Sequence, residues 1–261
     1  MDLFVKELGN SQAPPVVLLH GGGVAGWMWE KQVASFMDYH LLIPDLPGHG
    51  NSAQIPFVSM NDAASKVLTA VGDIVGEEKF TVIGFSLGAQ LVVEILSKWP
   101  EKVDSAIVLS ALVKPYAKGK NFLLSTLKMS FGLIKNKSFS KLQAKQLYIG
   151  KDKWETYYED SLKMTKSNFI NMMEANLSYS LPSSFAASDV RALVLVGMNE
   201  LERMKDSARE MVKANRNCIG YLVSGAGHGL SLAAPELFNE IVLNYINNIQ
   251  LHKNDKLDRI I

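Results

Sequence analysis

Short apolar runs alternate with amphipathic stretches along most of this 261-residue chain. The apolar runs are rich in β-branched residues and predict strands buried on both faces: Val16–Leu19, Leu41–Ile43, Phe80–Ile83, Val103–Leu109, Ala192–Val196 and Ile219–Val223. Apolar residues at helical spacing predict helices between them, over about Trp27–Met37, Met60–Val75, Leu87–Trp99, Asp206–Asn215 and Pro235–Asn248. Strands that alternate with helices predict an α/β fold, in which a mostly parallel twisted sheet carries helices on both faces.

The alternation lapses from about Lys114 to Ala187, where the sequence predicts helices and connections without clear buried strands. This stretch is therefore interpreted as an insertion into the α/β pattern. Its large apolar side chains include Phe122, Met129, Phe131, Phe139, Tyr148, Trp154, Tyr157, Tyr158, Met164, Phe169, Met172, Met173 and Tyr179. We expect most of them to pack the helices of the insertion, and some to line an apolar pocket with adaptable methionine walls.

Charge is nearly balanced over the whole chain, with a formal net charge of +1, so composition gives no electrostatic argument for nucleic-acid binding. Residues 114–187 nonetheless hold twelve lysines against five acidic residues. We expect most of these lysines to be solvated on helix faces. The functional alternative is an anionic substrate or an acidic surface.

The remaining composition indicates a reducing compartment. The single cysteine, Cys218, cannot form an internal disulfide and stands at the start of a predicted strand, so core packing is its expected role. The first residues carry charges and show no apolar signal segment, and no apolar run approaches the length of a membrane span. We therefore expect a soluble, cytoplasmic protein.

Residues 80–89 contain the strongest candidate for chemistry. A buried-strand pattern breaks at Gly84-Phe85-Ser86-Leu87-Gly88 and continues as a helix. This strand, sharp turn and helix form the context that a nucleophile elbow needs, in which the serine hydroxyl projects above the sheet. The flanking glycines fit this turn, because a Cβ at either place would collide with nearby backbone. Ser86 is the predicted nucleophile.

His228 is the predicted general base for Ser86. It lies in Ser-Gly-Ala-Gly-His-Gly, after a short predicted strand at Cys218–Val223 and shortly before a helix opened by Pro235. The chain order expected for such an elbow is serine, acid, histidine. This order excludes the histidines that precede the serine, namely His20, His40 and His49. The remaining one, His252, lies in a charged tail and is expected to be solvated.

The carboxylate that would orient His228 is expected just after the predicted strand Ala192–Val196. That strand runs into Gly-Met-Asn-Glu-Leu-Glu, which offers Glu200 and Glu202. A carboxylate at this place can accept the Nδ1 proton of the imidazole and stabilise the imidazolium. Glu200 is our choice and Glu202 the alternative. Either can instead be an ordinary acidic residue at a helix start, where the helix dipole favours negative charge.

The segment Val16–Gly23 predicts a buried strand followed by His20 and a run of glycines. The backbone N–H groups of Gly22 and Leu87 are predicted to form an oxyanion hole. A phosphate-binding loop is the competing interpretation, but the glycine run matches neither G-x-G-x-x-G nor a P-loop. The candidate residues that fall just past predicted strand ends, and so at one edge of the sheet, are Gly22, Ser86, Glu200 and His228.

These motifs, in this order, resemble the α/β-hydrolase superfamily in its small, capped, cofactor-free form. The landmarks are His20–Gly23, Asp45–Ser52, Gly84–Gly88 and Gly225–His228. The resemblance implies the α/β-hydrolase fold, no metal or other cofactor, and a helical cap at residues 114–187 inserted into a core of 1–113 and 188–261. It also implies that Asp45 and His49 are structural.

Two features depart from the usual pattern of that superfamily. Its acid is most often Asp, whereas Glu200 has a longer side chain. His20 comes early in the chain and leaves room for about one strand before it, where the full fold has two. We therefore expect a sheet with a shortened antiparallel edge.

The residues and the resemblance together predict a serine hydrolase that acts on a carboxylic ester or lactone with an apolar acyl group, through an acyl-enzyme. Serine at the elbow argues against the haloalkane dehalogenases and epoxide hydrolases of this fold, which use Asp there. Carbon–carbon bond hydrolysis and acyl transfer use the same residues and stay open. A small-molecule sensor that keeps the triad also stays open, as does a pseudoenzyme if neither Glu200 nor Glu202 meets His228.

Overall fold

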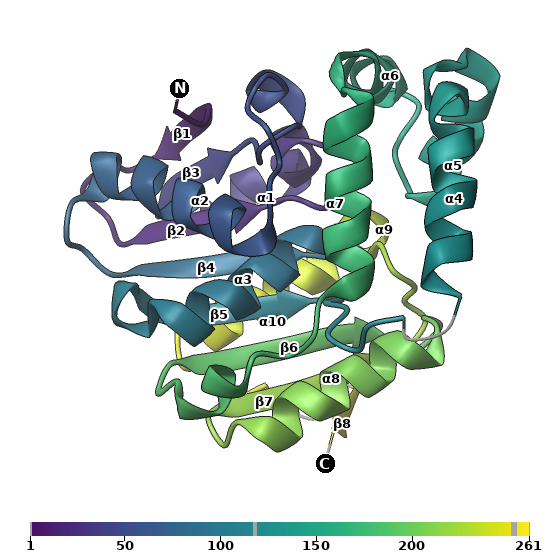
Figure 1. Cartoon of the computed structure of the whole chain (residues 1–261). Coiled ribbons are helices and arrows are strands. Elements are labelled where there is room, and N and C mark those ends of the chain that lie inside the picture. The colour runs from purple at the N-terminus through teal and green to yellow at the C-terminus, as the bar shows by residue number, and fades with distance from the viewer. Residues whose placement is uncertain (1, 117–118, 252–254, 261) are drawn as a thin grey trace.

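The computed structural model describes residues 2–116, 119–251 and 255–260, and its centre is an eight-stranded sheet (Figure 1). The strands lie in the order β1-β3-β2-β4-β5-β6-β7-β8. Their bounds are β1 Val5–Gly9, β2 Pro15–Leu19, β3 His40–Pro44, β4 Phe80–Phe85, β5 Val103–Leu109, β6 Arg191–Gly197, β7 Cys218–Val223 and β8 Leu257–Ile260. Neighbouring strands from β3 to β7 pair in parallel, while β1 and β8 pair antiparallel at the two edges.

The fold class predicted from the sequence is confirmed, because the sheet is mostly parallel and helices cover both of its faces. β1 lies before β2 in the chain and forms an antiparallel edge on β3, as the early position of His20 led us to expect. At the other edge the sequence analysis missed β8. This short strand exposes Asp258 and Arg259 and is held by its ladder with β7, so its hydrophobic pattern does not single it out.

The helices occupy most of the predicted positions. The α-helices are α1 Glu30–Val33, α2 Met60–Val75, α3 Leu87–Lys98, α4 Lys120–Ser130, α5 Lys137–Gln146, α6 Trp154–Lys163, α7 Lys166–Ser178, α8 Glu202–Ala214, α9 Leu230–Ala233 and α10 Pro235–Ile246. Short 3-10 helices are η1 Gly26–Trp29, η2 Ala34–Phe36, η3 Gly50–Ser52, η4 Pro100–Lys102, η5 Phe131–Lys135 and η6 Ser183–Ala187. The helical stretch predicted at Trp27–Met37 lies where expected, since η1, α1 and η2 follow one another without a gap from Gly26 to Phe36, but only its middle is α-helix. Trp29 and Phe36 from this stretch pack into the core.

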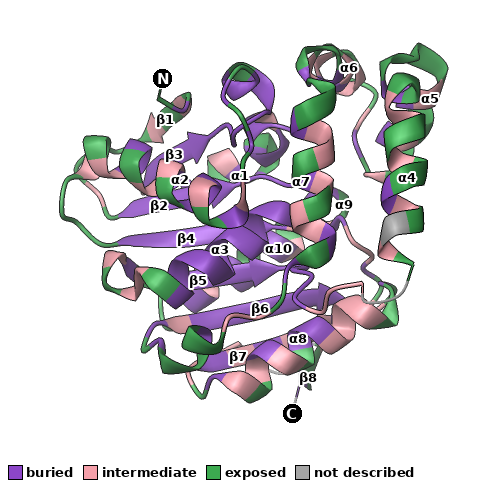
Figure 2. Ribbon diagram, viewed as in Figure 1, coloured by how far each residue is buried: buried purple, intermediate pink, exposed green. Residues whose placement is uncertain are grey.

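Successive side chains of a strand point to opposite faces of the sheet, and this divides the core in two. In β5, Ala106 and Val108 join a buried cluster with residues of α2, α3 and α8. Ile107 and Leu109 join a second cluster with residues of η1 and α10. Figure 2 shows the central strands buried along their length, whereas most covering helices are buried on one side.

Residues 114–187 carry α4, α5, α6 and α7, and the described part of this stretch contains no strand. Figure 1 shows these helices gathered at one end of the sheet. Trp27 Nε1–H donates to Asp160 in α6 at 2.9 Å, which ties this unit to the core. Asn168 in α7 donates from Nδ2 to the Ala53 carbonyl at 3.1 Å. The division into a core and a cap at residues 114 and 187 stays a prediction.

Two buried polar side chains hold the loops that follow β2 and β3. His20 donates from Nδ1 to the Gly21 carbonyl at 2.7 Å and accepts the Leu46 N–H on Nε2 at 2.9 Å. Burial lowers the pKa of His20 to about 4, so the ring is neutral and Nε2 remains an acceptor. The Asp45 carboxylate accepts the N–H groups of Gly26 and Asn51, each at 2.8 Å. These bonds fix the backbone on which the neighbouring site is built.

We expect Asp45→Ala to lower the free energy of unfolding by about 3 kcal/mol, because the N–H groups of Gly26 and Asn51 lose a charged acceptor. Urea denaturation followed by circular dichroism measures this change. Asp73→Ala, on the exposed side of α2, is the matched control and should leave the midpoint nearly unchanged. Equal midpoints for the two variants would contradict the role given to Asp45.

Candidate active site

Ser86 lies in a sharp turn between β4 and α3. Its φ is 53°, in the left-handed region that a residue with a side chain rarely adopts. The flanking glycines make the turn possible. A Cβ on Gly84 would lie 2.4 Å from the Gly88 carbonyl oxygen, and a Cβ on Gly88 would lie 2.3 Å from the carbonyl oxygen of Leu19 in β2. The serine is therefore held in a strained conformation at the carboxyl ends of the strands.

The structure brings Ser86, His228 and Glu200 into one hydrogen-bonded line. His228 Nε2 lies 3.1 Å from Ser86 Oγ, and His228 Nδ1 lies 2.7 Å from Glu200 Oε2. An ionised carboxylate only accepts, so Nδ1 carries the proton and Nε2 is left to accept from the serine hydroxyl. Residues that are far apart in the chain thus meet at one edge of the sheet, past the ends of β4, β6 and β7.

Glu200 is buried, and both of its carboxylate oxygens accept hydrogen bonds. Its Oε1 accepts the Gly197 N–H at 2.9 Å and the Ser110 hydroxyl at 2.6 Å. Burial alone would raise the pKa of Glu200, but its hydrogen bond and charge interaction with His228, together with the bonds from Ser110 and Gly197, outweigh burial and lower it. The carboxylate is therefore ionised at neutral pH. Sequence reasoning missed Ser110, whose only signal was its position directly after a predicted strand.

Glu202, the alternative acid, lies elsewhere. It is exposed in the first turn of α8 and forms ion pairs with Lys205 at 2.8 Å and Arg209 at 2.6 Å. Hydrogen bonds from Arg209 and then Lys205 lower the pKa of Glu202 to about 2. This is the ordinary acidic residue at a helix start that the sequence analysis weighed against a catalytic role.

The loop that carries His228 is in contact with Tyr148, which follows α5. A Cβ on Gly227 would lie 2.9 Å from the Tyr148 hydroxyl oxygen, and a Cβ on Gly229 would lie 2.6 Å from the Tyr148 ring. On its other side the imidazole packs against the Phe85 ring, with centroids 5.0 Å apart. The glycines beside His228 therefore leave room for Tyr148, a contact that chain order alone does not reveal.

Gly22 and Leu87, the predicted oxyanion-hole residues, are neighbours. A Cβ on Gly22 would lie 3.7 Å from the Leu87 side chain, and Gly22 and Ser86 line the same cavity. Within the described ranges, neither N–H group donates to another residue. Leu87 begins α3, where the helix dipole favours a negative charge. Their role in holding an oxyanion stays a prediction.

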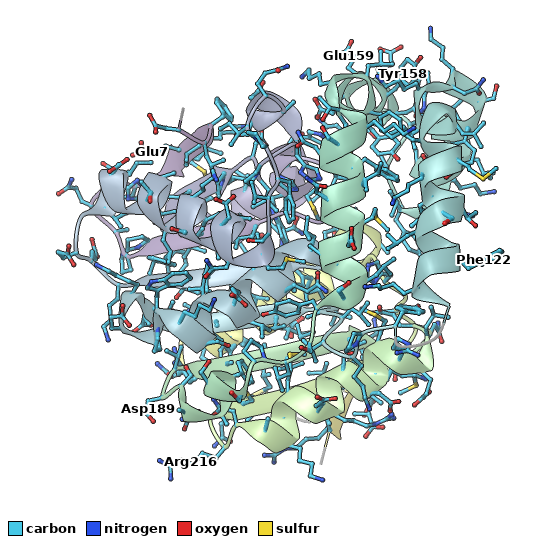
Figure 3. The ribbon with its side chains drawn as sticks, viewed as in Figure 1. Glu7, Phe122, Tyr158, Glu159, Asp189 and Arg216 are labelled. Atoms are coloured by element: carbon cyan, nitrogen blue, oxygen red, sulfur yellow. The ribbon has the colours of Figure 1, made fainter. Side chains whose placement is uncertain are left out.

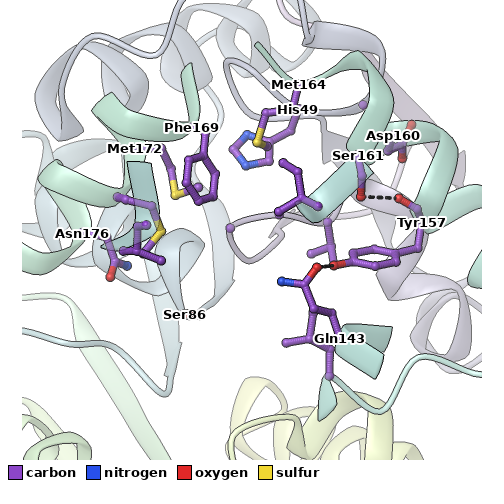
Figure 4. Close-up of a pocket in the computed structure, with 18 of the residues that line it drawn as sticks. His49, Ser86, Gln143, Tyr157, Asp160, Ser161, Met164, Phe169, Met172 and Asn176 are labelled. Carbon is purple, nitrogen blue, oxygen red and sulfur yellow. Dashed lines mark hydrogen bonds between the residues drawn. The ribbon is translucent and has the colours of Figure 1, made fainter. Parts of the chain in front are cut away.

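A cavity of about 370 Å³ opens beside Ser86 under the cap helices (Figure 4). Some of the large apolar residues predicted for the cap line it: Phe139, Tyr157, Met164, Phe169, Met172 and Met173. Others face outward, such as Phe122, which is 79% exposed and projects from the outer side of α4 (Figure 3). The cavity wall is therefore mainly apolar and holds three methionines.

Cationic side chains stay outside this cavity. No Lys or Arg occurs among the described residues that line it. Lys141, Lys145 and Lys151 instead border a separate groove beside Trp154. The described lysines of residues 114–187 thus do not line the wall around Ser86.

Other sequence expectations concern metals, membranes and the remaining reactive groups. Among the described residues, no cluster of His, Cys, Asp and Glu is suited to a metal ion. The helices of the described ranges are all too short or too polar to cross a membrane. Cys218 is buried, and burial raises its thiol pKa to about 12, so it is protonated at neutral pH. The expectation for His252 lies outside the described residues.

Comparisons with known proteins identify the family and agree with the fold. The family model described as "alpha/beta hydrolase fold" matches residues 14–235. The Bacillus subtilis protein "Carboxylesterase YbfK" is 27% identical over 91% of this chain and 82% of its own length. A "2-hydroxy-6-oxononadienedioate/2-hydroxy-6-oxononatrienedioate hydrolase" from Klebsiella pneumoniae is 22% identical over 94% of this chain and 90% of its own. An esterase structure from Exiguobacterium antarcticum superposes with a TM-score of 0.80 and 19% identity, covering 94% of this chain and 95% of that one.

We expect Glu200→Gln to lower turnover by about a thousandfold or more while the fold stays intact. An amide can donate to His228 Nδ1, which leaves the proton on Nε2 and prevents this atom from accepting the Ser86 proton. Ester hydrolysis followed at neutral pH measures the loss, and circular dichroism checks the fold.

Glu202→Gln is the matched control, because the same change at an exposed ion pair should leave turnover nearly unchanged. If instead Glu202→Gln is the inactive variant, the acid assigned to Glu200 is wrong. Full activity in both variants would place the acid in another segment.

Proposed function

This chain belongs to the alpha/beta hydrolase fold family, and on that premise we propose that it is a serine esterase that hydrolyses a carboxylic ester or lactone through an acyl-enzyme. The observation that supports this proposal is the line from Ser86 Oγ to His228 Nε2 at 3.1 Å and from His228 Nδ1 to Glu200 Oε2 at 2.7 Å. The name of the Bacillus subtilis relative, "Carboxylesterase YbfK", also describes ester hydrolysis, which supports the proposal.

In the first half-reaction, Ser86 Oγ attacks the acyl carbon while its proton passes to His228 Nε2. The imidazolium that forms is stabilised by the Glu200 carboxylate. Because Ser110 and Gly197 hold the other carboxylate oxygen, Glu200 cannot turn away from the histidine. His228 then returns the proton to the leaving alcohol, which for a lactone stays attached to the acyl chain.

The negative charge that develops on the carbonyl oxygen is held by the N–H groups of Gly22 and Leu87. Preorganised donors of this kind are worth on the order of 3 kcal/mol each. In the second half-reaction water attacks the acyl carbon while its proton passes to His228 Nε2. The bond between the acyl carbon and Ser86 Oγ then breaks, His228 returns the proton to Oγ, and the carboxylic acid is released.

The cavity supports a neutral, mainly apolar acyl group. Its volume of about 370 Å³ is near the lower end of the range for small-molecule pockets. Carboxylates are usually recognised by Arg or Lys, and no such residue is among the described lining residues. This favours a monoester or lactone over the dicarboxylate named for the Klebsiella pneumoniae relative.

We expect a fluorophosphonate probe to label Ser86 and Ser86→Ala to lose both the label and esterase turnover, because the probe reacts with an activated serine. Peptide mapping by mass spectrometry locates the adduct. Ser130→Ala is the matched control, since Ser130 lines the same cavity but donates to the Leu127 carbonyl, and it should keep the label. An adduct on another serine, or none, would contradict the proposal.

We expect Ile134→Phe to shift the preferred acyl chain of ester substrates toward shorter lengths, because Ile134 is buried in the cavity wall and a larger ring fills part of the space. A series of p-nitrophenyl esters of increasing chain length measures the shift. The control is Leu133→Phe at the neighbouring residue, which is 50% exposed and should leave the profile unchanged. An unchanged profile in Ile134→Phe would show that this wall does not contact the acyl chain.

A further inference from the structure

His49 is a buried imidazole in the wall of the cavity that contains Ser86. It lies in the loop between β3 and η3 and is 3% exposed. Figure 4 shows its ring at the cavity, near Met164. The sequence resemblance implied only a structural role for this residue, yet one of its two nitrogens has no hydrogen-bond partner among the residues that the structure describes.

The proton of His49 is fixed on Nδ1. This nitrogen lies 2.9 Å from the Pro47 carbonyl oxygen, which can only accept, so Nδ1 is the donor. Burial, followed by the nearby His20, lowers the pKa of His49 to about 3, and the ring is neutral at physiological pH. Nε2 is then a hydrogen-bond acceptor, and it has no partner among the described residues although it is buried.

The loop around His49 leaves this acceptor little freedom to find a partner elsewhere. The Asp45 carboxylate holds the Asn51 N–H at 2.8 Å. On the other side Asn168 of α7 packs against Gly48, where an added Cβ would lie 3.0 Å from the Asn168 side chain. An unpaired buried acceptor held in a fixed orientation is expensive for the fold, and such groups recur where a ligand completes the bond.

A donor enters the same cavity from α5. Gln143 Oε1 accepts the Tyr157 hydroxyl at 3.3 Å, and its amide N–H groups donate to no described residue. Figure 4 shows the Gln143 amide directed into the cavity, in the wall opposite His49 in this view. Among the polar groups of this mainly apolar cavity, His49 therefore offers a neutral acceptor and Gln143 a neutral donor.

The remaining charge in the wall disfavours an anion. Asp160 lines the cavity, and its carboxylate accepts from Trp27 Nε1 and pairs with Lys163. No described lining residue is Lys or Arg, so a carboxylate on the substrate would be buried beside Asp160 without a cation of its own in the wall. A neutral hydrogen-bonding group fits better.

We propose that His49 and Gln143 form a polar subsite that selects esters or lactones whose acyl chain carries a hydroxyl group. The hydroxyl group of the substrate donates to His49 Nε2. The Gln143 amide donates to an oxygen atom of the substrate's acyl chain in the same cavity. His49 is a specificity-determining residue in this assignment and takes no part in the covalent steps. The inference rests on the proposed esterase function.

Matched methyl esters test the subsite on the wild-type protein. Methyl hexanoate is compared with methyl hydroxyhexanoates that carry the hydroxyl at each successive carbon, and with monomethyl adipate as the anionic control. We expect kcat/KM for one hydroxylated ester to exceed that for methyl hexanoate by about tenfold, the effect of about one net hydrogen bond. Monomethyl adipate should be the poorest substrate of the series.

Two variants of His49 remove Nε2 in different ways. His49→Asn keeps a side-chain donor for the Pro47 carbonyl, and His49→Phe keeps the ring volume. Both variants should bring the ratio of kcat/KM for the preferred hydroxylated ester to kcat/KM for methyl hexanoate to about one. Gln143→Leu should lower the same ratio. Phe139→Leu is the control in the same wall, because it removes only apolar contact and should retain the ratio.

The outcomes separate this inference from the proposed function. The subsite is overturned if the wild-type protein hydrolyses none of the hydroxylated esters with a higher kcat/KM than methyl hexanoate. It is also overturned if both His49 variants retain the wild-type preference for the hydroxylated ester. In those cases hydrolysis of methyl hexanoate still supports the esterase. If no ester of the series is hydrolysed, the proposed function fails and the subsite fails with it.

Discussion

The close approach of the elbow to β2 is the constraint on which the site depends. α3 begins so near to β2 that a Cβ on Gly88 would lie 2.3 Å from the Leu19 carbonyl oxygen. This approach holds Ser86 in its left-handed conformation and directs the start of α3 toward the loop that carries Gly22. The neighbouring parallel strands then present their own loops at the same edge, because parallel strands share one carboxyl end.

Buried hydrogen bonds keep those loops in place. Glu200 is held by the Gly197 N–H and the Ser110 hydroxyl, so its second oxygen stays available for His228. The loop of His228 is in turn covered by Tyr148 from the inserted helices. The stretch that supplies much of the cavity wall therefore also contacts the loop of the proposed base, through Tyr148 in the turn after α5.

The hydrophobic pattern predicted the central strands well, because a strand buried on both faces is apolar throughout and stands out from its surroundings. It failed where that condition does not hold. β8 exposes Asp258 and Arg259 and depends on pairing with β7. The stretch predicted as helix at Trp27–Met37 is helical, but the pattern did not distinguish the 3-10 turns η1 and η2 from α-helix.

The sequence by itself determined the fold class and the segments expected at the site, since the alternation of strands and helices, the spacing of glycines and the order of motifs along the chain are all legible in it. It selected Ser86 and His228, but its two candidate acids stand two residues apart and look alike in sequence. Only the tertiary structure placed Glu200 on the histidine and Glu202 in surface ion pairs. It also decided the partner of the acid, Ser110, which lies 90 residues away in the chain. Such contacts depend on how distant strands and loops pack against each other. A local pattern of residues does not specify which distant side chains will meet.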